Sequence, residues 1–357
     1  MDARAGGGRS GRAGLDLARL NRVLVVNAGS TSLKLSVVDD ADESEAVASL
    51  HELPPGIEAV AHRVVHGGSE FREAVVVDGG VEDALRRLVE LAPLHNAPAV
   101  AAIDEARRSV PDVPHVAVFD TAFHATIPPE AATYALPRAF REEWGIRRYG
   151  FHGLSVEWAS ERVPVERLVV CHLGGGCSVT AVLRARSVDT SMGFTPLEGV
   201  PMATRSGSVD PGALLYLRRH GLATDALEHA LEHDSGLAGL SEISGDVRDL
   251  DASTSEAARL ALDVFTYRVA SAVAALTVPL GGLDALVFTA GVGEHSAPVR
   301  ARVCGRLAHL GVALDGDANG TAEPDADVAA DGSPVRVVVL RAREDVVAAR
   351  AARTLLG

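Results

Sequence analysis

Short apolar runs alternate with stretches of helical periodicity along the 357 residues of the chain. Runs rich in valine, leucine and isoleucine and bounded by glycine are typical of strands buried in a sheet. A chain in which such strands alternate with helices is expected to be of the α/β class. Because one hydrophobic core rarely serves so long a chain, the sequence predicts an α/β protein of two domains.

Three segments join a strand-like run to a turn of small residues. Residues 22–40 and 167–183 each contain a β-run, a glycine-containing turn and a second β-run, which predicts two hairpins. Residues 285–307 contain a buried strand, a glycine turn and a helix. Glycine lets backbone N–H groups approach an anion closely. The repeated design favours a duplicated domain that closes on a nucleotide from both sides.

Neither of two common nucleotide-binding motifs is complete. The pattern G-x-x-x-x-G-K-[ST] is absent, and "AGVGEHS" at 290–296 lacks the third glycine of the dinucleotide-binding motif. A single glycine-rich turn is more often only a hairpin. Nucleotide binding is therefore indicated by the repetition of the design and not by any one turn.

The repeats also set the expected domain limits. Residues 1–21 are rich in glycine and arginine and lack the apolar core of a secretory signal, so we expect a disordered extension. A transit-like or tag-derived tail is the alternative. The last strand and helix are expected to return beside the first half. The first domain is then 22–149 with about 346–357, and the second, nucleotide-binding domain is 150–345.

Composition argues against several kinds of partner. The formal net charge of −14 disfavours nucleic acid and anionic membranes. No uninterrupted apolar run reaches the ~18 residues that span a bilayer. The three cysteines, Cys171, Cys177 and Cys304, lack zinc-site spacing and are odd in number. Reduced thiols in a cytoplasm are the interpretation that fits best.

Lys34 is the single lysine of the chain, and the other 33 of its 34 basic residues of the two types are arginine. An ammonium group is compact, whereas a guanidinium is a wide planar fork. A tight phosphate-binding turn could accept the first and exclude the second. Chance survival of one lysine in an arginine-biased chain is the alternative.

Five polar residues occur within apolar or glycine-rich strings, where a core would not favour them: Arg63, His95, Asp120, His152 and Arg205. Asp120 ends a buried strand, which is where open α/β sheets bind ligands. His95 directly precedes a predicted helix start, with Asn96 as a plausible N-cap. Each also has a structural explanation as a cap or a surface ion pair, so only the combination argues for function.

The combination suits phosphoryl transfer. That reaction needs cations on the phosphoryl oxygens, a bridging metal and in-line alignment more than it needs covalent help. Arg63 and Arg205 offer planar forks for oxyanions. Asp120 and a late carboxylate in "RARED" offer oxygen ligands to Mg²⁺.

Together these strings resemble the acetate/propionate kinase family of the actin–hexokinase–heat-shock-chaperone superfamily. The resemblance covers nearly everything from about residue 22 and is carried by "VNAGSTSLK", "AHRVVHGG", "LAPLHNAP", "FDTAFHATIP", "YGFHG", "HLGGG", "MGFTPLEGVPMATRSG", "GDVRDL" and "FTAGVGEHS". It implies a two-domain, duplicated actin-like (ribonuclease H-like) α/β fold with a nucleotide cleft between the domains.

The resemblance also implies roles for individual residues. The implied catalytic set is Asp120, Arg63, Arg205, His152 and His95. The implied substrate pocket is Arg63 with the apolar residues Val65, Leu94, Phe151 and Pro196. The implied nucleotide and phosphate contacts are Asn27, Ser30, Ser32, Lys34, His172, Gly174, Gly175, Gly176, Asp246, Val247, Arg248, Gly291 and Gly293. The implied ligands of Mg²⁺, with Mn²⁺ as an alternative, are Asn27, Asp120 and Glu344.

The chain departs from the family at a few positions. Gly175 and His295 stand where the family usually has asparagine, and Ala125 stands where a polar residue is common. The chain is also shorter than usual between Asp40 and Arg63. Glycine at position 175 removes a side-chain amide that is expected to bind phosphate. The shortening could alter the expected dimer contacts or access of the substrate.

By resemblance we expect a cytoplasmic, homodimeric, Mg²⁺-dependent kinase. It would transfer the γ-phosphoryl group of ATP to acetate by direct in-line displacement, reversibly, giving acetyl phosphate and ADP. A propionate or butyrate kinase on the same scaffold is the first alternative. A non-catalytic, chaperone-like nucleotide switch is the second, and the full catalytic set argues against it.

Overall fold

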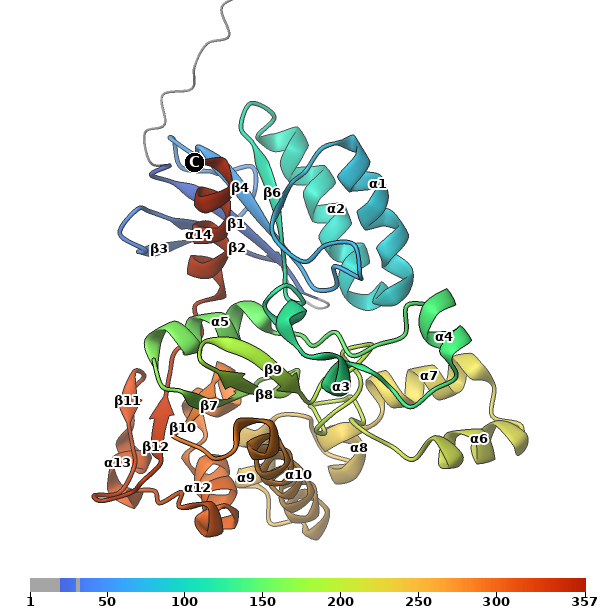
Figure 1. Ribbon diagram of the computed structural model, residues 1–357, viewed down its shortest axis with the longest axis vertical. Coiled ribbons are helices and arrows are strands. Elements are labelled where there is room, and N and C mark those ends of the chain that lie inside the picture. The colour runs from blue at the N-terminus through green and yellow to red at the C-terminus, as the bar shows by residue number, and fades with distance from the viewer. Residues whose placement is uncertain (1–19, 30–32) are drawn as a thin grey trace, which may run out of the picture.

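A computed structural model describes residues 20–29 and 33–357, so residues 1–19 of the predicted extension lie outside it. Two six-stranded mixed sheets form its framework (Figure 1). The first has the order β3-β2-β1-β4-β6-β5 and the second β11-β12-β10-β7-β8-β9. The strands are β1 (Val23–Ala28), β2 (Leu33–Val38), β3 (Ser44–Val47), β4 (Ala59–Val64), β5 (Val75–Val76), β6 (His115–Phe119), β7 (Arg167–Leu173), β8 (Cys177–Leu183), β9 (Arg186–Thr190), β10 (Ala285–Thr289), β11 (Ala326–Asp327) and β12 (Arg336–Val339).

The second sheet repeats the first strand for strand. Strands β7, β8 and β9 form an antiparallel meander, as β1, β2 and β3 do. Strands β10 and β12 then extend the sheet in parallel, as β4 and β6 do. The short strands β11 and β5 close the two sheets as antiparallel edges. This duplication confirms the predicted α/β class, the actin-like fold and the two glycine-turn hairpins.

Both faces of the first sheet are covered by helices. Leu24 and Val26 of β1 pack with α2 (Pro93–Ser109), whereas Val23 and Val25 pack with α14 (Glu344–Leu356). Because successive side chains of a strand point to opposite faces, a strand buried on both faces must be apolar at nearly every position. This explains the unbroken run in β1. Helix α1 (Gly79–Arg87) packs beside α2.

The second sheet is covered in the same way. The long helix α10 (Glu256–Leu280) packs on β7 and β8 from one side, and α5 (Gly153–Arg162) packs on β7 from the other. By length and composition alone α10 is apolar enough to cross a membrane. Its buried positions, which include Phe265, Val269 and Val273, instead belong to the core cluster of the second sheet.

Two helices cross between the halves. Helix α5 follows β6 of the first sheet yet packs on the second, and α14 follows β12 of the second sheet yet packs on β1 and β4. The two helices contact each other (Figure 1). One buried cluster joins them to both sheets. The expectation that the last strand accompanies α14 to the first half is wrong, because β12 pairs with β10 in parallel register from Ala285↔Arg336 to Phe288↔Val339. The domain limits stay a prediction.

The remaining helices are short and lie mostly in the second half. Asp210 caps α6, accepting a hydrogen bond of 2.8 Å from the Gly212 N–H, as its sequence position predicts. Helices α6 and α7 project from the body of the molecule (Figure 1). The elements are η2 (Phe123–Thr126), α3 (Pro129–Ala132), α4 (Arg138–Glu143), α6 (Pro211–Arg219), α7 (Thr224–His233), α8 (Gly236–Ser241), α9 (Val247–Ala252), α11 (Ala290–His295), α12 (Ala297–Arg306), η3 (Ala308–Leu310) and α13 (Gly316–Thr321), with η1 (Leu88–Leu91) before α2.

The predicted N-cap role of Asn96 is wrong. Helix α2 begins at Pro93, a residue well suited to the first helical turn, and Asn96 lies inside the helix and is buried. Its side-chain amide donates to the carbonyls of His66 and Leu88 and accepts from the His66 N–H. Asn96 therefore ties α2 to the chain segment that follows β4.

A buried arginine fastens the helices of the second half. Arg300 is 2% exposed and donates to Asn319 Oδ1 at 2.7 Å and to the carbonyls of Asn319, Gly293 and Glu294 at 2.9 Å. Because Arg300→Met would leave buried acceptors unpaired, we expect it to lower the free energy of unfolding by about 3 kcal/mol. Urea unfolding measures this. Arg302→Met, at a partly exposed arginine, should cost under about 1 kcal/mol, and equal losses would contradict the assignment.

Candidate active site

The site begins at the carboxyl ends of three parallel strands in the first sheet. Asn27 on β1 lies in register with Arg63 on β4, and Asp120 directly follows β6 with its N–H bonded to the Val64 carbonyl at 3.0 Å. Parallel strands place their carboxyl ends at one edge, where α/β proteins bind ligands. The fold therefore brings together three residues that are far apart in the sequence.

Arg63 is the centre of a charged network. Its Nε donates to Asp120 Oδ1 at 2.8 Å and its Nη2 to Asp120 Oδ2 at 2.6 Å, a bidentate pair. Its Nη1 donates to Asn27 Oδ1 at 3.0 Å and lies 3.4 Å from Glu344 Oε2. Burial alone would lower the pKa of Arg63, but the two carboxylates outweigh it and raise that pKa. Burial raises the pKa of Asp120, against the opposing charge of Arg63.

Two histidines line the same cavity as Arg63, His172 on β7 and His152 just before α5. His152 has a left-handed backbone (φ 58°) just before α5, and its ring stacks on that of His172 with centroids 4.0 Å apart. His152 Nδ1 lies 2.9 Å from Ser178 Oγ and His172 Nδ1 lies 2.8 Å from Ser155 Oγ. Burial lowers the pKa of His152 well below its usual value and that of His172 to about 3. Both rings are therefore neutral near pH 7.

Glycines allow the two halves to approach. A Cβ on Gly153 would lie 2.1 Å from the Asp120 carbonyl oxygen, so only glycine lets α5 start there. A Cβ on Gly176 would lie 2.9 Å from Arg205 Nη2 and 3.3 Å from His152 Nε2. The β7–β8 turn thus meets Arg205 and His152 at one point. Arg205 is held by a hydrogen bond of 2.7 Å from its Nη1 to the Pro196 carbonyl.

His95, in the first turns of α2, joins this group. Burial, together with the nearby charges of Arg205 and Arg63, lowers its pKa to about 4. The five residues predicted to be catalytic are thus brought together from both halves of the chain. Their individual roles stay predictions.

Two cavities adjoin this cluster. The first, of about 510 Å³, is lined by Gly29, Ala290, Glu294 and Ala342 together with the predicted residues Asn27, Lys34, Arg63, His152, His172, Gly174, Gly175, Gly176, Gly291 and Glu344. The second, of about 710 Å³, contains Asp246, Val247 and Arg248 in its wall. Gly174, Gly175 and Gly291 belong to both walls, so the polar cavity continues into the second one. This arrangement suits an elongated, partly anionic ligand.

Gly293 and the apolar residues of the implied substrate pocket are not among those that line these two cavities. Gly293 lines neither cavity, because it packs against β10, with its Cβ position 3.2 Å from the Phe288 carbonyl carbon. Leu94 is 38% exposed, whereas Val65 and Phe151 share one buried cluster. Ser30 and Ser32 lie outside the described residues.

Sequence reasoning missed three residues beside the cavity. Ser155 and Ser178 orient the two histidine rings. Glu294 lines the first cavity and accepts a hydrogen bond of 2.9 Å from the Ala342 N–H, two residues before Glu344. A glutamate within the glycine-rich string "GVGEHS" was a usable signal for the last. The two serines follow from no pattern in the sequence.

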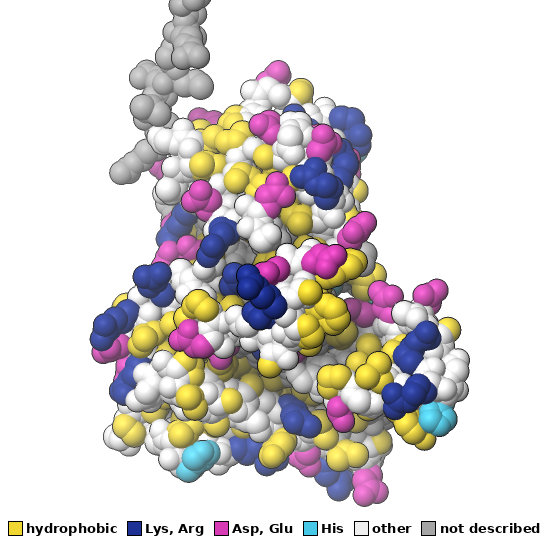
Figure 2. All heavy atoms as spheres, turned by 45° about the vertical axis from the view of Figure 1, so that its right-hand side comes forward, with side chains coloured by type: hydrophobic (Ala, Val, Ile, Leu, Met, Phe, Trp, Pro, Cys, Tyr) yellow, Lys and Arg dark blue, Asp and Glu magenta, His cyan; other side chains and the backbone are white. Residues whose placement is uncertain are grey.

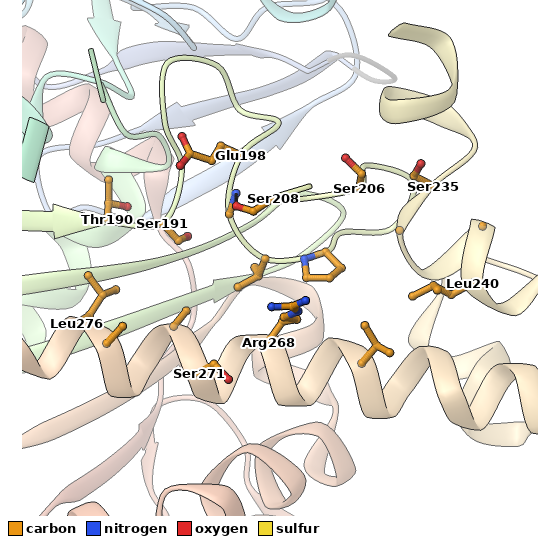
Figure 3. Close-up of a pocket in the computed structure, with 18 of the residues that line it drawn as sticks. Thr190, Ser191, Glu198, Ser206, Ser208, Ser235, Leu240, Arg268, Ser271 and Leu276 are labelled. Carbon is orange, nitrogen blue, oxygen red and sulfur yellow. Dashed lines mark hydrogen bonds between the residues drawn. The ribbon is translucent and has the colours of Figure 1, made fainter. Parts of the chain in front are cut away.

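A larger cavity of about 740 Å³ contains none of the predicted site residues. It is bounded by α10 and by loop residues that include Glu198, Ser206 and Ser208 (Figure 3). This cavity is larger than either of the two joined cavities. We nevertheless place the candidate active site in the joined cavities, because the charged groups from both halves of the chain converge there.

Buried histidines should make the fold sensitive to acid. Burial lowers the pKa to about 3 for His62 and to about 4 for His66, His95 and His124. In the unfolded chain these rings bind protons below about pH 6.5, whereas in the folded protein they do not. The free energy of unfolding is therefore at its full value above that pH and decreases as the pH falls toward 4. Each ring lowers it by up to about 2 kcal/mol between pH 7 and pH 5. Glu157, whose pKa burial raises to about 7, opposes it.

Urea unfolding at pH 7, 6 and 5 measures this dependence. His62→Phe should reduce the pH slope, while the same test on His309→Asn, at an exposed position, should leave it unchanged. A flat profile between pH 7 and pH 5 would contradict the neutral, buried state of the rings.

Comparison with known proteins agrees with this geometry. The model of the acetokinase family matches residues 48–350. A protein named acetate kinase from Nostoc punctiforme is 43% identical over 343 residues, which is 90% of this chain and 84% of the relative. This chain belongs to the acetokinase family. Another acetate kinase, from Gloeobacter violaceus, is 49% identical over 313 residues, 83% of this chain and 76% of its own.

Solved structures of acetokinases share the fold. A propionate kinase from Francisella tularensis superposes with a TM-score of 0.85 at 32% identity, over 93% of this chain and 98% of that one. An acetate kinase from Porphyromonas gingivalis superposes with a TM-score of 0.83 at 30% identity, over 94% and 100%. As an acetokinase, the chain is an enzyme of the kinase class.

Proposed function

We propose that this acetokinase transfers the γ-phosphoryl group of ATP to acetate, reversibly, giving acetyl phosphate and ADP. The observation that carries the proposal is the convergence of Arg63 and Arg205, from the two halves of the chain, beside one polar cavity that continues into a second. Positioned cations and a cleft for the nucleotide are the main requirements of phosphoryl transfer. The many relatives named acetate kinase support acetate as the acceptor.

The two joined cavities divide the nucleotide between them. We assign the phosphates to the first, where Lys34, His172 and the Gly174–Gly176 turn are exposed to the ligand. We assign the adenosine to the second, beside Asp246, Val247 and Arg248. Asp246 is fixed there because its carboxylate accepts from the Arg248 N–H at 2.9 Å and caps α9. A Cβ on Gly175 would meet no atom within 4 Å, so the missing family asparagine leaves space and not a distorted turn.

Transfer needs no strong base in this site. The acceptor is already a carboxylate, so its oxygen can attack the γ-phosphorus in line as soon as it is positioned. Arg63 and Arg205 would hold the oxygens of the acceptor and of the migrating group. The neutral ring of His152, with Nδ1 against Ser178, directs Nε2 toward Gly176 and the cavity. Closure of the cleft would exclude water, the competing acceptor.

The chain offers oxygen ligands that suit Mg²⁺. Asn27, Asp120 and Glu344 meet around Arg63, so two carboxylates share a single cation and leave an excess negative charge. The described residues contain no cluster of three or more histidine, cysteine or acidic side chains that could hold a metal alone. Mg²⁺ characteristically uses one or two carboxylates with water and phosphate oxygens, so the residues fit it, and Mn²⁺ would take the same ligands. The bound ion would neutralise phosphate charge.

The acyl pocket separates acetate from longer acids. We assign the methyl group to the surface of Val65, Phe151, Leu94 and Pro196. One extra methylene in such a pocket is worth only about 1–3 kcal/mol, so propionate is the first alternative substrate. The superposition on a propionate kinase keeps this alternative open to test.

We further propose a cytoplasmic homodimer. Helix α6 projects from the body and exposes Leu215, Tyr216 and Leu217 at 58%, 55% and 42% (Figure 1). Hydrophobic side chains are also visible on the surface of the lower half in Figure 2. Exposed apolar clusters of this kind mark interaction surfaces.

Leu215→Glu should therefore convert the dimer to a monomer in sedimentation velocity, because it places a charge in the proposed contact. Leu355→Glu, at a residue 42% exposed on α14, is the matched control and should remain dimeric. A wild-type monomer, or a variant that stays dimeric, would contradict this contact.

Trapping acyl phosphate with hydroxylamine tests the proposed function. Purified protein would receive Mg·ATP with acetate, propionate, butyrate or no acid. We expect the hydroxamate signal to be strongest with acetate and to fall with chain length. A maximum at propionate would move the substrate and keep the mechanism. ATP binding without hydroxamate from any acid would reject the kinase and favour the nucleotide switch.

A further inference from the structure

His66 contacts both walls of the proposed acyl pocket. It directly follows Val65 after β4 and is fully buried. Its ring meets the ring of Phe151 edge-on, with centroids 5.2 Å apart, and that of Tyr149 at 4.7 Å. It does not line the polar cavity, so it lies behind the pocket and not in the path of the phosphoryl group.

Hydrogen bonds fix the proton of this ring. The Gly68 N–H donates to His66 Nδ1 at 2.9 Å, so Nδ1 has no proton. Nε2 therefore carries the proton and donates it to the Phe194 carbonyl at 3.0 Å. Burial lowers the pKa of His66 to about 4, which keeps this neutral tautomer at physiological pH.

The backbone behind the ring is equally fixed. Asn96 accepts from the His66 N–H at 3.1 Å and donates to the His66 carbonyl at 3.0 Å. Asn96 is buried in α2 next to His95. The ring therefore projects from a rigid base in the first half of the chain toward a loop in the second half.

That loop carries the opposite wall of the pocket. The Phe194 N–H donates to the Tyr134 hydroxyl at 3.0 Å, and this hydroxyl donates to Glu198. Two residues after Phe194, the Pro196 carbonyl accepts from Arg205 at 2.7 Å. A shift of Phe194 would therefore move Pro196 and change the support of Arg205. Glu198 also lines the separate cavity beside α10 (Figure 3).

We propose that His66 is a positioning residue that sets carboxylate selectivity. Its hydrogen bond to Phe194 fixes the spacing between the wall of Val65 and Phe151 and the wall of Pro196, which determines how large an acyl group fits. The inference rests on the proposed function, because it assumes that the acid binds between these walls.

A pair of substitutions separates the two ring nitrogens. In His66→Gln the side-chain amide nitrogen can reach the position of Nε2 and still donate to Phe194. In His66→Asn the shorter amide oxygen replaces Nδ1 and still accepts from Gly68, but nothing reaches Phe194. Both variants keep a neutral polar side chain at this buried position. Steady-state kinetics would measure KM for acetate, propionate and ATP, and kcat/KM for each acid.

We expect His66→Asn to raise KM for acetate about tenfold, which corresponds to about 1.4 kcal/mol, and to reduce the preference between acetate and propionate. KM for ATP should change less than twofold. His66→Gln should restore KM for acetate to within about threefold of the wild type. Equal kinetics of the two variants, or equal changes in KM for acetate and ATP, would overturn the proposal.

Two further measurements keep the test decisive. Thermal unfolding shows whether each variant is folded. If His66→Asn does not fold, Tyr134→Phe loosens the same loop from its other side, and an unchanged selectivity in that variant would overturn the proposal. A wild type that forms no acyl phosphate would reject the proposed function itself, which is a different result from unaltered selectivity in an active enzyme.

Discussion

Replacing Arg205 with alanine should lower kcat by about 10³-fold or more and leave the fold intact. An arginine that stabilises the transferring phosphoryl group is worth roughly 10³–10⁵ in rate. Within residues 20–29 and 33–357, Arg205 forms no ion pair within 4.0 Å, and its Nη1 donates to the neutral carbonyl of Pro196. Burial lowers the pKa of Arg205, against the opposing charge of Glu232. We therefore expect an incoming oxyanion to pair with Arg205.

The measurement is kcat for acyl phosphate formation, with thermal unfolding as the check on folding. Arg205→Lys keeps the charge but loses the planar fork, so its activity should lie between those of alanine and wild type. Arg219→Ala, at an exposed position on α6, is the matched control and should retain full activity. A kcat within tenfold of wild type for Arg205→Ala would reject its role.

Asp120→Asn should lower kcat by about 10²–10³-fold and increase the Mg²⁺ concentration needed for half-maximal rate. Asp120 is fully buried and uses both carboxylate oxygens to hold Arg63. An amide offers one acceptor and turns an N–H toward the guanidinium, so Arg63 would lose its fixed orientation. The loss of one preorganised partner typically costs this much in rate. The proposed metal site would also lose one of its two carboxylates.

A magnesium titration of the rate at saturating ATP separates the two effects. If Asp120 only orients Arg63, kcat falls and the magnesium dependence stays unchanged, which would remove Asp120 from the proposed ligand set. Asp83→Asn, whose side chain is 73% exposed on α1, controls for the change of charge and should behave as wild type. A normal kcat in Asp120→Asn would contradict the proposal that the network around Arg63 contributes to catalysis.

Local patterns predicted much of the framework. Strands β1 and β2, and likewise β7 and β8, pair antiparallel, as the two β-runs on either side of each glycine-containing turn predicted. The unbroken apolar run of β6 predicted a buried strand with Asp120 at its end, and the structure shows it. Lys34 lies exposed opposite Asn27 and faces the polar cavity, although its role stays a prediction. These features depend on neighbours within a few residues.

Features that depend on contacts between distant parts of the chain could not be predicted from local patterns. The approach of Glu344 to Asn27, 317 positions away, depends on α14 crossing from the second sheet to the first, and no local pattern predicts that crossing. The same limit explains the wrong partner of β12, since its apolar run fits either sheet. Asn96 was wrongly predicted to cap the helix, because the sequence does not distinguish an amide that caps a helix from one that binds a distant backbone segment. The family resemblance, and not the periodicity, placed Glu344 at the site.

Phosphorus NMR of the protein with Mg·ATP and acetate detects phosphoryl transfer itself. We expect an acyl phosphate resonance that grows one-to-one with ADP, requires acetate and is absent with Arg205→Ala. Release of ADP and inorganic phosphate at the same rate with and without acetate, with no acyl phosphate, would contradict it.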